Sequence, residues 1–305
     1  MNRTTMNREP FPMFFLFYLW PVMCVGGPTF DPAEGPGRLL SRDGIAFAEG
    51  NVRAKGYDVN DINKLRLAAT DANVGVRQDV LVVVTHRHGQ QAIPILMRAL
   101  DDPYSLVRCT AARMLGVLGS NSGLDRMRKD MVGLAGPEQK EGSSETNDRN
   151  GQPKRLIPQS RDQRLCDALE AAEVLADFGD ASGYEMAARA ALQKRHGPMR
   201  LVALVVLAKI HKIDEATLKA KGYDPEAVLL KVVESETAPI VIRTVADCAM
   251  SYMRPQSKIR ILEAVERSPH TSRLSNLQRQ AIRNGLTNAR KQVEQKEETS
   301  PHERN

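Results

Sequence analysis

The residues best suited by type and spacing to do chemistry are two histidines that end an apolar run. Residues 80–88 read Val-Leu-Val-Val-Val-Thr-His-Arg-His, which looks like a buried strand that ends in a metal-binding His-x-His. A metal site would need further ligands, but a glycine and two glutamines follow. If the run is helical instead, His86 and His88 point to different faces. We predict two helix-end histidines here and no metal site.

The four cysteines are the next candidates, as metal ligands or nucleophiles. They lie far apart in the sequence and have no histidine at metal-ligand spacing. Cys109, Cys166 and Cys248 lie in stretches rich in Ala and Leu, where a free cysteine behaves as a small buried hydrophobe. Cys24 ends an apolar run and is a candidate for lipidation.

Other catalytic signatures are absent from the sequence. It contains no Gly-rich phosphate loop and no nucleophile elbow. Two acidic pairs suit helix starts, where carboxylates meet free N–H groups. They are Asp101 with Asp102, and Asp58 with the nearby Asp61. We therefore predict no catalytic residue, no cofactor and no metal.

The N-terminus is typical of an export signal. Arg3 and Arg8 precede an apolar stretch, residues 11–25, which two prolines interrupt and which is short for a membrane span of about 20 residues. We predict that residues 1–27 are a signal peptide or N-terminal anchor. The protein would then be exported to the periplasm, cell envelope or outside, with cleavage, lipidation at Cys24 and retention in the membrane as alternatives.

A repeated pattern dominates the rest of the chain. Residues 64–90 and 97–120 superimpose at an offset of 31, so that Asp71 falls on Asp102 and Arg77 on Arg108. Related Arg-containing segments recur around Arg200 and Arg243. Each segment carries apolar residues at i, i+4 and i+8, which form one stripe of a helix. Periods of 30–45 residues with two amphipathic helices each indicate an α-solenoid.

A second duplication concerns helix ends. The pentapeptide Ala-Lys-Gly-Tyr-Asp occurs at residues 54–58 and again at 220–224. Glycine can end a helix in the left-handed conformation, and the following Asp can cap the next helix. Pro225 fits the first position of that helix. We predict a capping motif rather than a binding site.

Composition shifts divide the chain further. Residues 136–163 contain only two large aliphatic side chains and equal numbers of acidic and basic residues, which predicts a disordered insertion. The predicted segments are a Gly/Pro-rich tether and leading helix (28–57), N-terminal repeats (58–135), the insertion (136–163), C-terminal repeats (164–288) and a polar tail (289–305).

The clearest repeat has a sequence that resembles a known family. Its elements are Leu100-Asp-Asp-Pro, Val107-Arg108, Ala111-Ala112 and Leu115-Gly. They resemble a HEAT-like repeat of the armadillo type, which is also found in phycobilin-lyase-related proteins. The resemblance covers about residues 58–288. It implies an all-α, right-handed solenoid of about five or six helix pairs.

The resemblance also implies an Asp–Arg ladder between neighbouring repeats. It leads us to expect this ladder for Asp71 with Arg77 and for Asp102 with Arg108. Arg200 and Arg243 occupy the same position in later repeats, where Lys194 and Thr237 replace the turn Asp.

The charge of the chain is concentrated near its C-terminus. The formal net charge is +6, and residues 254–291 hold nine basic and two acidic residues, a charge of +7. This segment could coat the solvated face of the last helix pair, or bind an acidic partner or anionic membrane. The candidate partner-binding residues are Arg273, Arg279 and Arg283.

The sequence favours an exported HEAT-repeat scaffold that binds another protein along its concave surface without catalysis. One alternative is an accessory protein or lyase of the phycobilin-lyase-like class. The other is a protein that binds an anionic partner or nucleic acid through its basic C-terminal helices, with nucleic acid the least favoured partner.

Overall fold

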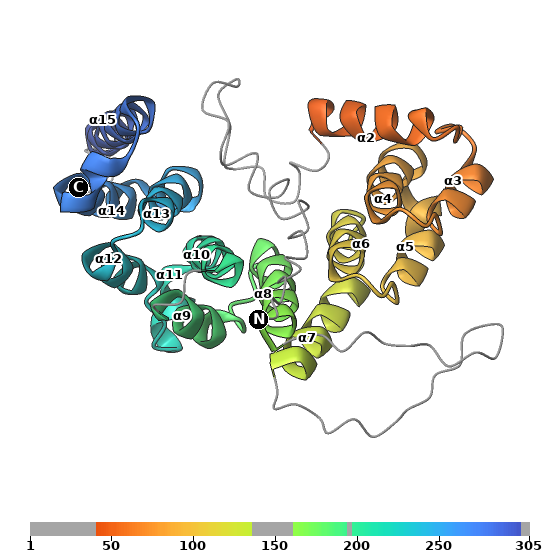
Figure 1. Cartoon of the computed structure of the whole chain (residues 1–305), viewed down its shortest axis with the longest axis horizontal. Coiled ribbons are helices and arrows are strands. Elements are labelled where there is room, and N and C mark those ends of the chain that lie inside the picture. Colours follow the sequence, from red (N-terminus) through yellow and green to blue (C-terminus); the bar gives the residue numbers. More distant parts are fainter. Residues whose placement is uncertain (1–40, 136–160, 194–196, 300–305) are drawn as a thin grey trace, which may run out of the picture.

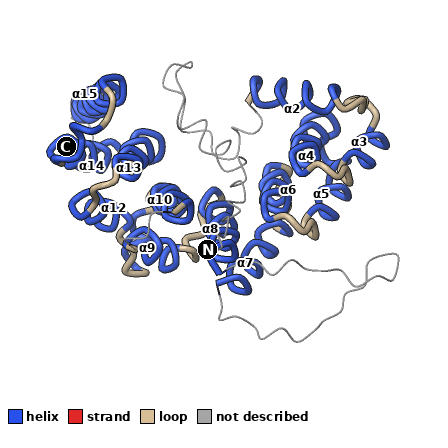
Figure 2. The backbone as a smooth tube through the Cα atoms, in the orientation of Figure 1, coloured by secondary structure: helices blue, strands red, loops and turns tan. Residues whose placement is uncertain are grey.

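The fold consists of helices joined by short turns. The computed structural model describes residues 41–135, 161–193 and 197–299, and within these ranges it contains no strand (Figure 2). The helices are α2 (Arg42–Ala54), α3 (Ile62–Ala68), α4 (Val74–His88), α5 (Ile93–Ala99), α6 (Ser105–Val117), α7 (Ser122–Ala135), α8 (Arg161–Asp177), α9 (Tyr184–Leu192), α10 (Pro198–Ile210), α11 (Glu215–Ala220), α12 (Pro225–Ser235), α13 (Pro239–Tyr252), α14 (Pro255–Arg267) and α15 (Asn276–Thr299). Two 3-10 turns, η2 (Gly89–Ala92) and η3 (Pro269–Arg273), lie between them.

These helices form an arch of two layers. The antiparallel pairs are α3/α4, α5/α6, α7/α8, α9/α10, α12/α13 and α14/α15. The second helices α4, α6, α8, α10 and α13 each pack against the next and lie on the inner side of the arch, whereas the first helices lie outside (Figure 1). We call this inner row of second helices the inner layer. The predicted all-α solenoid of about five or six HEAT-like pairs is confirmed.

The apolar stripes identified in the sequence form the core. Val76, Val80 and Val84 of α4 are buried, as are Ala111 and Leu115 of α6. Such a stripe buries one face of a helix against its pair partner, while neighbouring pairs cover the remaining apolar surface. The β-branched run of residues 80–84 is therefore helical because the tertiary contacts outweigh its preference for strands.

Small residues let consecutive helices approach closely. A Cβ atom at Gly123 of α7 would lie 2.6 Å from the Cα atom of Ala112 in α6. Gly183, before α9, meets Ala172 of α8 in the same way, with a Cβ-to-Cβ distance of 2.4 Å. Each close approach joins a second helix to the first helix of the next pair, so these glycines set the spacing between repeats.

The duplicated pentapeptide ends helices as predicted. Gly56 and Gly222 have φ angles of 83° and 69°, and the N–H groups of Tyr57 and Tyr223 reach back to carbonyls five residues earlier. Asp224 also caps α12, because its carboxylate accepts a hydrogen bond from the N–H of Ala227 at 2.9 Å. In the first copy the next helix, α3, is capped by Asp61 and not by Asp58.

Two predicted boundaries are corrected by the structure. Helix α8 begins at Arg161, so the last three residues of the predicted insertion are helical, and α7 packs closely on α8. Helix α15 continues to Thr299 although we expected a polar tail from residue 289. Ile282, Leu286 and Ala289 are buried at helical spacing and anchor the first part of α15, whereas none of residues 290–295 is buried. Residues 136–160 and the predicted signal with Cys24 lie outside the described residues.

Candidate functional site

A row of charged side chains crosses the middle of the inner layer. Arg113 of α6 contacts Asp177 of α8 at 3.0 Å and Glu173 of α8 at 3.2 Å. From the other side, Lys209 of α10 contacts the same two carboxylates at 2.7 Å and 2.6 Å. The Lys209 ammonium also lies 5.7 Å from the ring centre of Tyr252 in α13. We call Arg113, Glu173, Asp177, Lys209 and Tyr252 the polar row.

The charges of the polar row balance one another. The two cations and two carboxylates are only 6–16% exposed. Burial lowers the pKa of Lys209, but the Glu173 and Asp177 carboxylates outweigh this effect and raise it. Burial raises the pKa of Asp177, but the nearby Lys209 and Arg113 cations outweigh this effect and lower it below its usual value. Lys209 and Asp177 therefore stay charged at neutral pH, and each is held in place by its oppositely charged neighbours.

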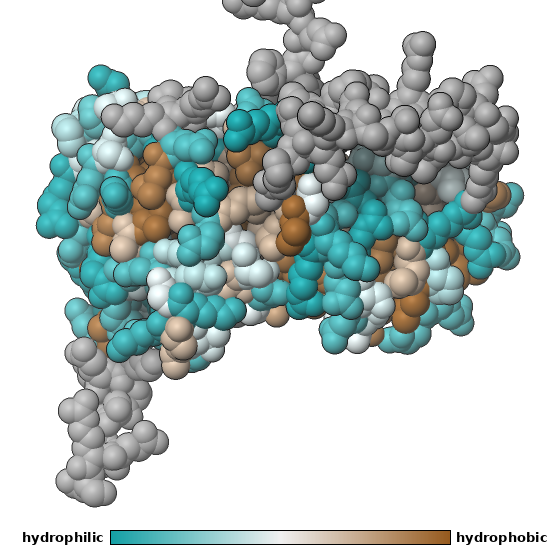
Figure 3. Space-filling model, turned by 90° about the horizontal axis from the view of Figure 1, so that it is seen from below, coloured by the Kyte–Doolittle hydropathy of each residue, from teal (hydrophilic) through white to brown (hydrophobic). Residues whose placement is uncertain are grey.

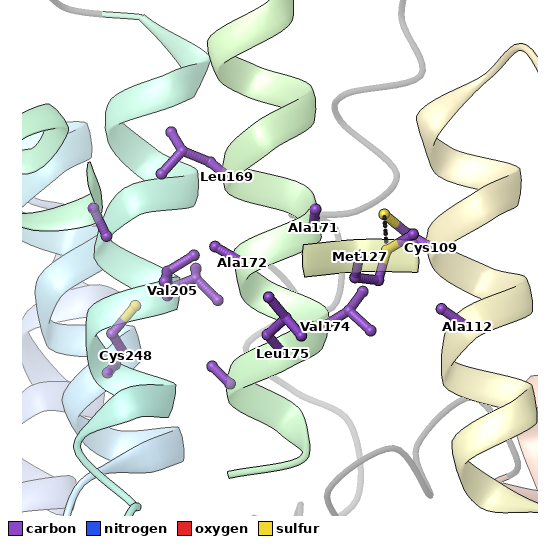
Figure 4. Close-up of a cluster of buried hydrophobic side chains, with 14 of the residues drawn as sticks. Cys109, Ala112, Met127, Leu169, Ala171, Ala172, Val174, Leu175, Val205 and Cys248 are labelled. Atoms are coloured by element: carbon purple, nitrogen blue, oxygen red, sulfur yellow. Dashed lines mark hydrogen bonds between the residues drawn. The ribbon is translucent and has the colours of Figure 1, made fainter. Parts of the chain in front are cut away.

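Helix α8 supplies the carboxylates because its position is fixed from both sides. Leu169 and Ala172 of α8 face Val205 of α10 (Figure 4). Ala171 and Val174 point to the other side, toward α6 and Met127 (Figure 4). A helix packed this way cannot rotate, so its polar stripe must face the inner side of the arch. That stripe consists of Asp167, Glu170, Glu173 and Asp177.

Three carboxylates of the inner layer lie outside the polar row and have raised pKa values. Glu170 accepts a hydrogen bond from Ser105 Oγ at 2.7 Å, and burial raises its pKa to about 7. Asp79 accepts one from Asn51 Nδ2 at 2.9 Å, and burial raises its pKa to about 6. Burial also raises the pKa of Asp247 to about 7, although an arginine one turn away opposes it. The inner layer is thus rich in groups that titrate near neutral pH.

The expected ladder exists, but its pairs are shifted by one repeat. The Arg77 guanidinium binds the Asp102 carboxylate of the next repeat at 2.8 Å and 3.0 Å. From its own repeat it binds only backbone carbonyls, those of Asp71 at 2.7 Å and Ala72 at 3.3 Å. The expected carboxylate pair of Asp71 with Arg77 is therefore wrong, because the Asp71 carboxylate accepts from Tyr57 Oη and the N–H of Asn73, both at 2.7 Å.

The next ladder arginine repeats this arrangement. Arg108 contacts Asp130 of α7 at 2.8 Å and the backbone carbonyl of Asp102 at 2.9 Å. The expected pair of Asp102 with Arg108 is thus also a backbone contact. Asp130 lies in the middle of a helix just before the predicted insertion, where the sequence repeat is interrupted, so no pattern pointed to it.

The later ladder residues differ from one another. Arg200 pairs with Glu236, and its Nε–H donates to the carbonyl of Ala191 at 2.8 Å. Glu236 also accepts hydrogen bonds from the backbone N–H groups of Thr237 and Ala238, in the turn before α13. An acidic residue shortly before a helix start is the sequence signal that could have identified it. Arg243 pairs with Asp247 of its own helix at 3.3 Å.

Much of the predicted basic surface at the C-terminus is neutralised. Arg254 pairs with Glu215, Arg260 with Glu226 and Arg290 with Glu263. The first two acids come from outside the basic segment, from α11 and α12, so the charge of the assembled end is lower than that of the segment alone.

The three candidate partner-binding arginines do not act alike. Arg279 donates to the carbonyls of Ser272 and Leu274 at 2.8 Å and 3.1 Å, and so stabilises the turn into α15. Arg283 is 65% exposed and lies 3.8 Å from Glu266. Arg273 is exposed in η3. Replacing Arg279 would disturb the fold, so it is unsuitable as a probe of binding alone.

Two helix-end histidines, a C-cap histidine and three cysteines of the described residues occupy structural positions. His86 and His88 lie at the end of α4, as predicted, and His88 Nε2 has no hydrogen-bond partner in the described part of the chain. His211 is the C-cap of α10; burial and nearby Arg254 lower its pKa to about 4. Burial raises the pKa of the thiols, which are Cys109, Cys166 and Cys248. Within residues 41–135, 161–193 and 197–299, no cluster of three His, Cys, Asp or Glu could hold a metal ion.

The likeness of this chain to known proteins is slight. No protein-family description and no curated protein matches its sequence. Among solved structures, the complex of CpcE and CpcF of phycocyanin lyase from a Nostoc species is similar over 87% of this chain and 96% of that chain. The sequence identity is 15% and the TM-score is 0.37. The class of the protein, an α-solenoid of HEAT-like helix pairs, therefore rests on its own helix packing. No helix in the described ranges is long and apolar enough to span a bilayer.

Proposed function

We propose that this protein is a non-catalytic scaffold that binds another protein along the inner layer of its arch. The observation that supports this most is the polar row, in which contacts run from α6 through α8 and α10 to α13. Solenoids of this kind present their concave side as an extended binding surface.

The energetics of the polar row favour a role beyond stability. A buried ion pair often stabilises a fold no better than apolar side chains of the same size. Apolar residues would therefore hold α6, α8 and α10 together equally well. Charged groups that are already fixed lose little conformational entropy when a partner binds, which makes them suitable for recognition.

The absence of catalysis in this proposal is supported by the state of the thiols. Burial raises the pKa of Cys109, Cys166 and Cys248, so each stays protonated at neutral pH. A protonated, buried thiol is a poor nucleophile.

We also propose that the protein is exported, on the basis of the apolar run within residues 1–27. Fusing these residues to a reporter enzyme tests this. Recovery of the reporter outside the cytoplasm would support export, and recovery in the cytosol would contradict it.

The proposed binding surface can be tested with matched lysine variants. His86 of α4 and Val117 of α6 are exposed and lie nine residues after the ladder arginines of their helices, the position that Lys209 holds in α10. The controls Leu67 of α3 and Val132 of α7 are 64% and 69% exposed on the outer helices. Figure 3 shows that the outer side is mostly hydrophilic, with separate apolar patches. All four residues lie near helix C-termini, where lysine is tolerated.

The measurement is cross-linking and affinity capture from the native host. We expect the wild type and the double variant L67K/V132K to capture the same protein. The double variant H86K/V117K should no longer capture it. Loss of that protein with the outer variant but not with the inner variant would contradict the proposal.

A further inference from the structure

The C-terminal end of the arch contains a hollow between α14, η3 and the start of α15. Its polar lining comes from Glu266, Ser268, Ser272, Arg279 and Arg283, and its apolar lining comes mainly from Pro269 and Ile282. From residue 267 to residue 293 the sequence contains six basic residues and no acidic residue. The hollow therefore opens within the most basic part of the chain.

Two arginines of the hollow differ in mobility. The Arg279 guanidinium is held by the carbonyls of Ser272 and Leu274 and by Asn276 Oδ1. Within the described part of the chain no group accepts its Nε–H. Arg283, one turn later, is largely exposed and has only a distant ion pair, 3.8 Å, with Glu266. One cation is thus fixed at the hollow, and the second is free to move toward a ligand.

We propose that this hollow binds a phosphate-type oxyanion. Guanidinium groups donate two parallel hydrogen bonds to such an anion, and the Ser268 hydroxyl, which accepts from the N–H of His270, can donate a further one. Glu266 competes with the anion for Arg283, so binding requires that this loose ion pair opens. An exposed pair of this kind contributes little free energy, so the ligand can replace it.

The balance of charges in the hollow allows variants that act in opposite directions. R283Q removes the mobile cation and should weaken binding about three- to tenfold, as expected for one charge-assisted contact at an exposed site. E266Q removes the competing carboxylate and should tighten binding. R290Q is the matched control, because Arg290 joins the same two helices through Glu263 at 2.8 Å but does not line the hollow.

The experiment is a calorimetric titration of the full chain with inorganic phosphate at constant ionic strength, with chloride as the reference anion. We expect saturable binding that is weakened by R283Q, strengthened by E266Q and unchanged by R290Q. Equal weakening by R283Q and R290Q would show that the basic end attracts anions without a site. Absence of saturable binding in both the wild type and E266Q would overturn the proposal. Neither outcome bears on the inner layer, so the proposed scaffold function is tested separately.

Discussion

Replacing Glu170 by glutamine removes a buried carboxylate from the contact between α6 and α8. In the folded protein burial raises the pKa of this group from 4.5 to about 7, and its hydrogen-bond donor is the Ser105 hydroxyl, which is neutral. The proton is therefore bound more tightly in the folded than in the unfolded chain. By linkage, this group lowers the stability of the fold as pH rises from about 4.5 to about 7.

The size of the effect follows from the shift. Each pKa unit corresponds to about 1.4 kcal/mol, so a shift of about 2.5 units is worth at most about 3.4 kcal/mol. Between pH 5 and pH 8.5 this group should lower the free energy of unfolding by about 2.5 kcal/mol. Glutamine can accept the Ser105 hydrogen bond and carries no charge, so it avoids this loss. We expect E170Q to be near the wild type in stability at pH 5 and more stable at pH 8.5.

The assay is thermal unfolding followed by circular dichroism at 222 nm at pH 5, 7 and 8.5. For a domain of this size, about 2.5 kcal/mol corresponds to roughly 5–10 °C in Tm. The other titrating carboxylates are common to both proteins and cancel in the difference. The control is E294Q, at an exposed position of α15, where we expect a difference that hardly changes with pH. If the Tm difference between E170Q and the wild type is the same at all three pH values, Glu170 is not the buried acid described above.

Two further substitutions test the spacing and the ladder of the repeats. G123A should destabilise the protein by about 1–3 kcal/mol, because a methyl group would meet the backbone of Ala112 at 2.6 Å, whereas G133A in the same helix has free space and should stabilise it by about 0.5–1 kcal/mol. Equal effects on Tm would contradict the close approach. R77K should lower stability by about 2–3 kcal/mol in urea unfolding, because lysine cannot bridge both the Asp102 carboxylate and a backbone carbonyl. An unchanged unfolding midpoint would show that the ladder contact contributes nothing.

The helices and their pairing could be predicted from the sequence because both depend on local patterns. The apolar residues at i, i+4 and i+8 predicted helices even where the run from residue 80 to residue 84 favours strands. The Lys-Gly ends at residues 55–56 and 221–222 depend only on the freedom of glycine at positive φ. The polarity after residue 289 was misleading, because these residues continue a helix whose first part is anchored by the buried Ile282, Leu286 and Ala289.

The charged partners could not be predicted in the same way. Arg77, Arg108 and Arg200 were recognised as ladder positions, but their carboxylate partners Asp102, Asp130 and Glu236 lie 25, 22 and 36 residues later. The spacing from arginine to partner varies because helix lengths and turns differ between repeats. A fixed sequence period therefore finds the arginine and misses its partner.

The sequence by itself determined that this protein is a helical solenoid, because helix periodicity and capping act over a few residues. Only the tertiary structure decided that Arg113, Glu173, Asp177 and Lys209 meet in one row, since in the sequence each looks like a solvated charge. Their meeting depends on the rotation and separation of α6, α8 and α10, which are set by the packing of Ala172 toward α10 and of Ala171 toward α6 (Figure 4). The low exposure of these charges is likewise a property of three helices together, because no single amphipathic helix can bury a charge and supply its partner.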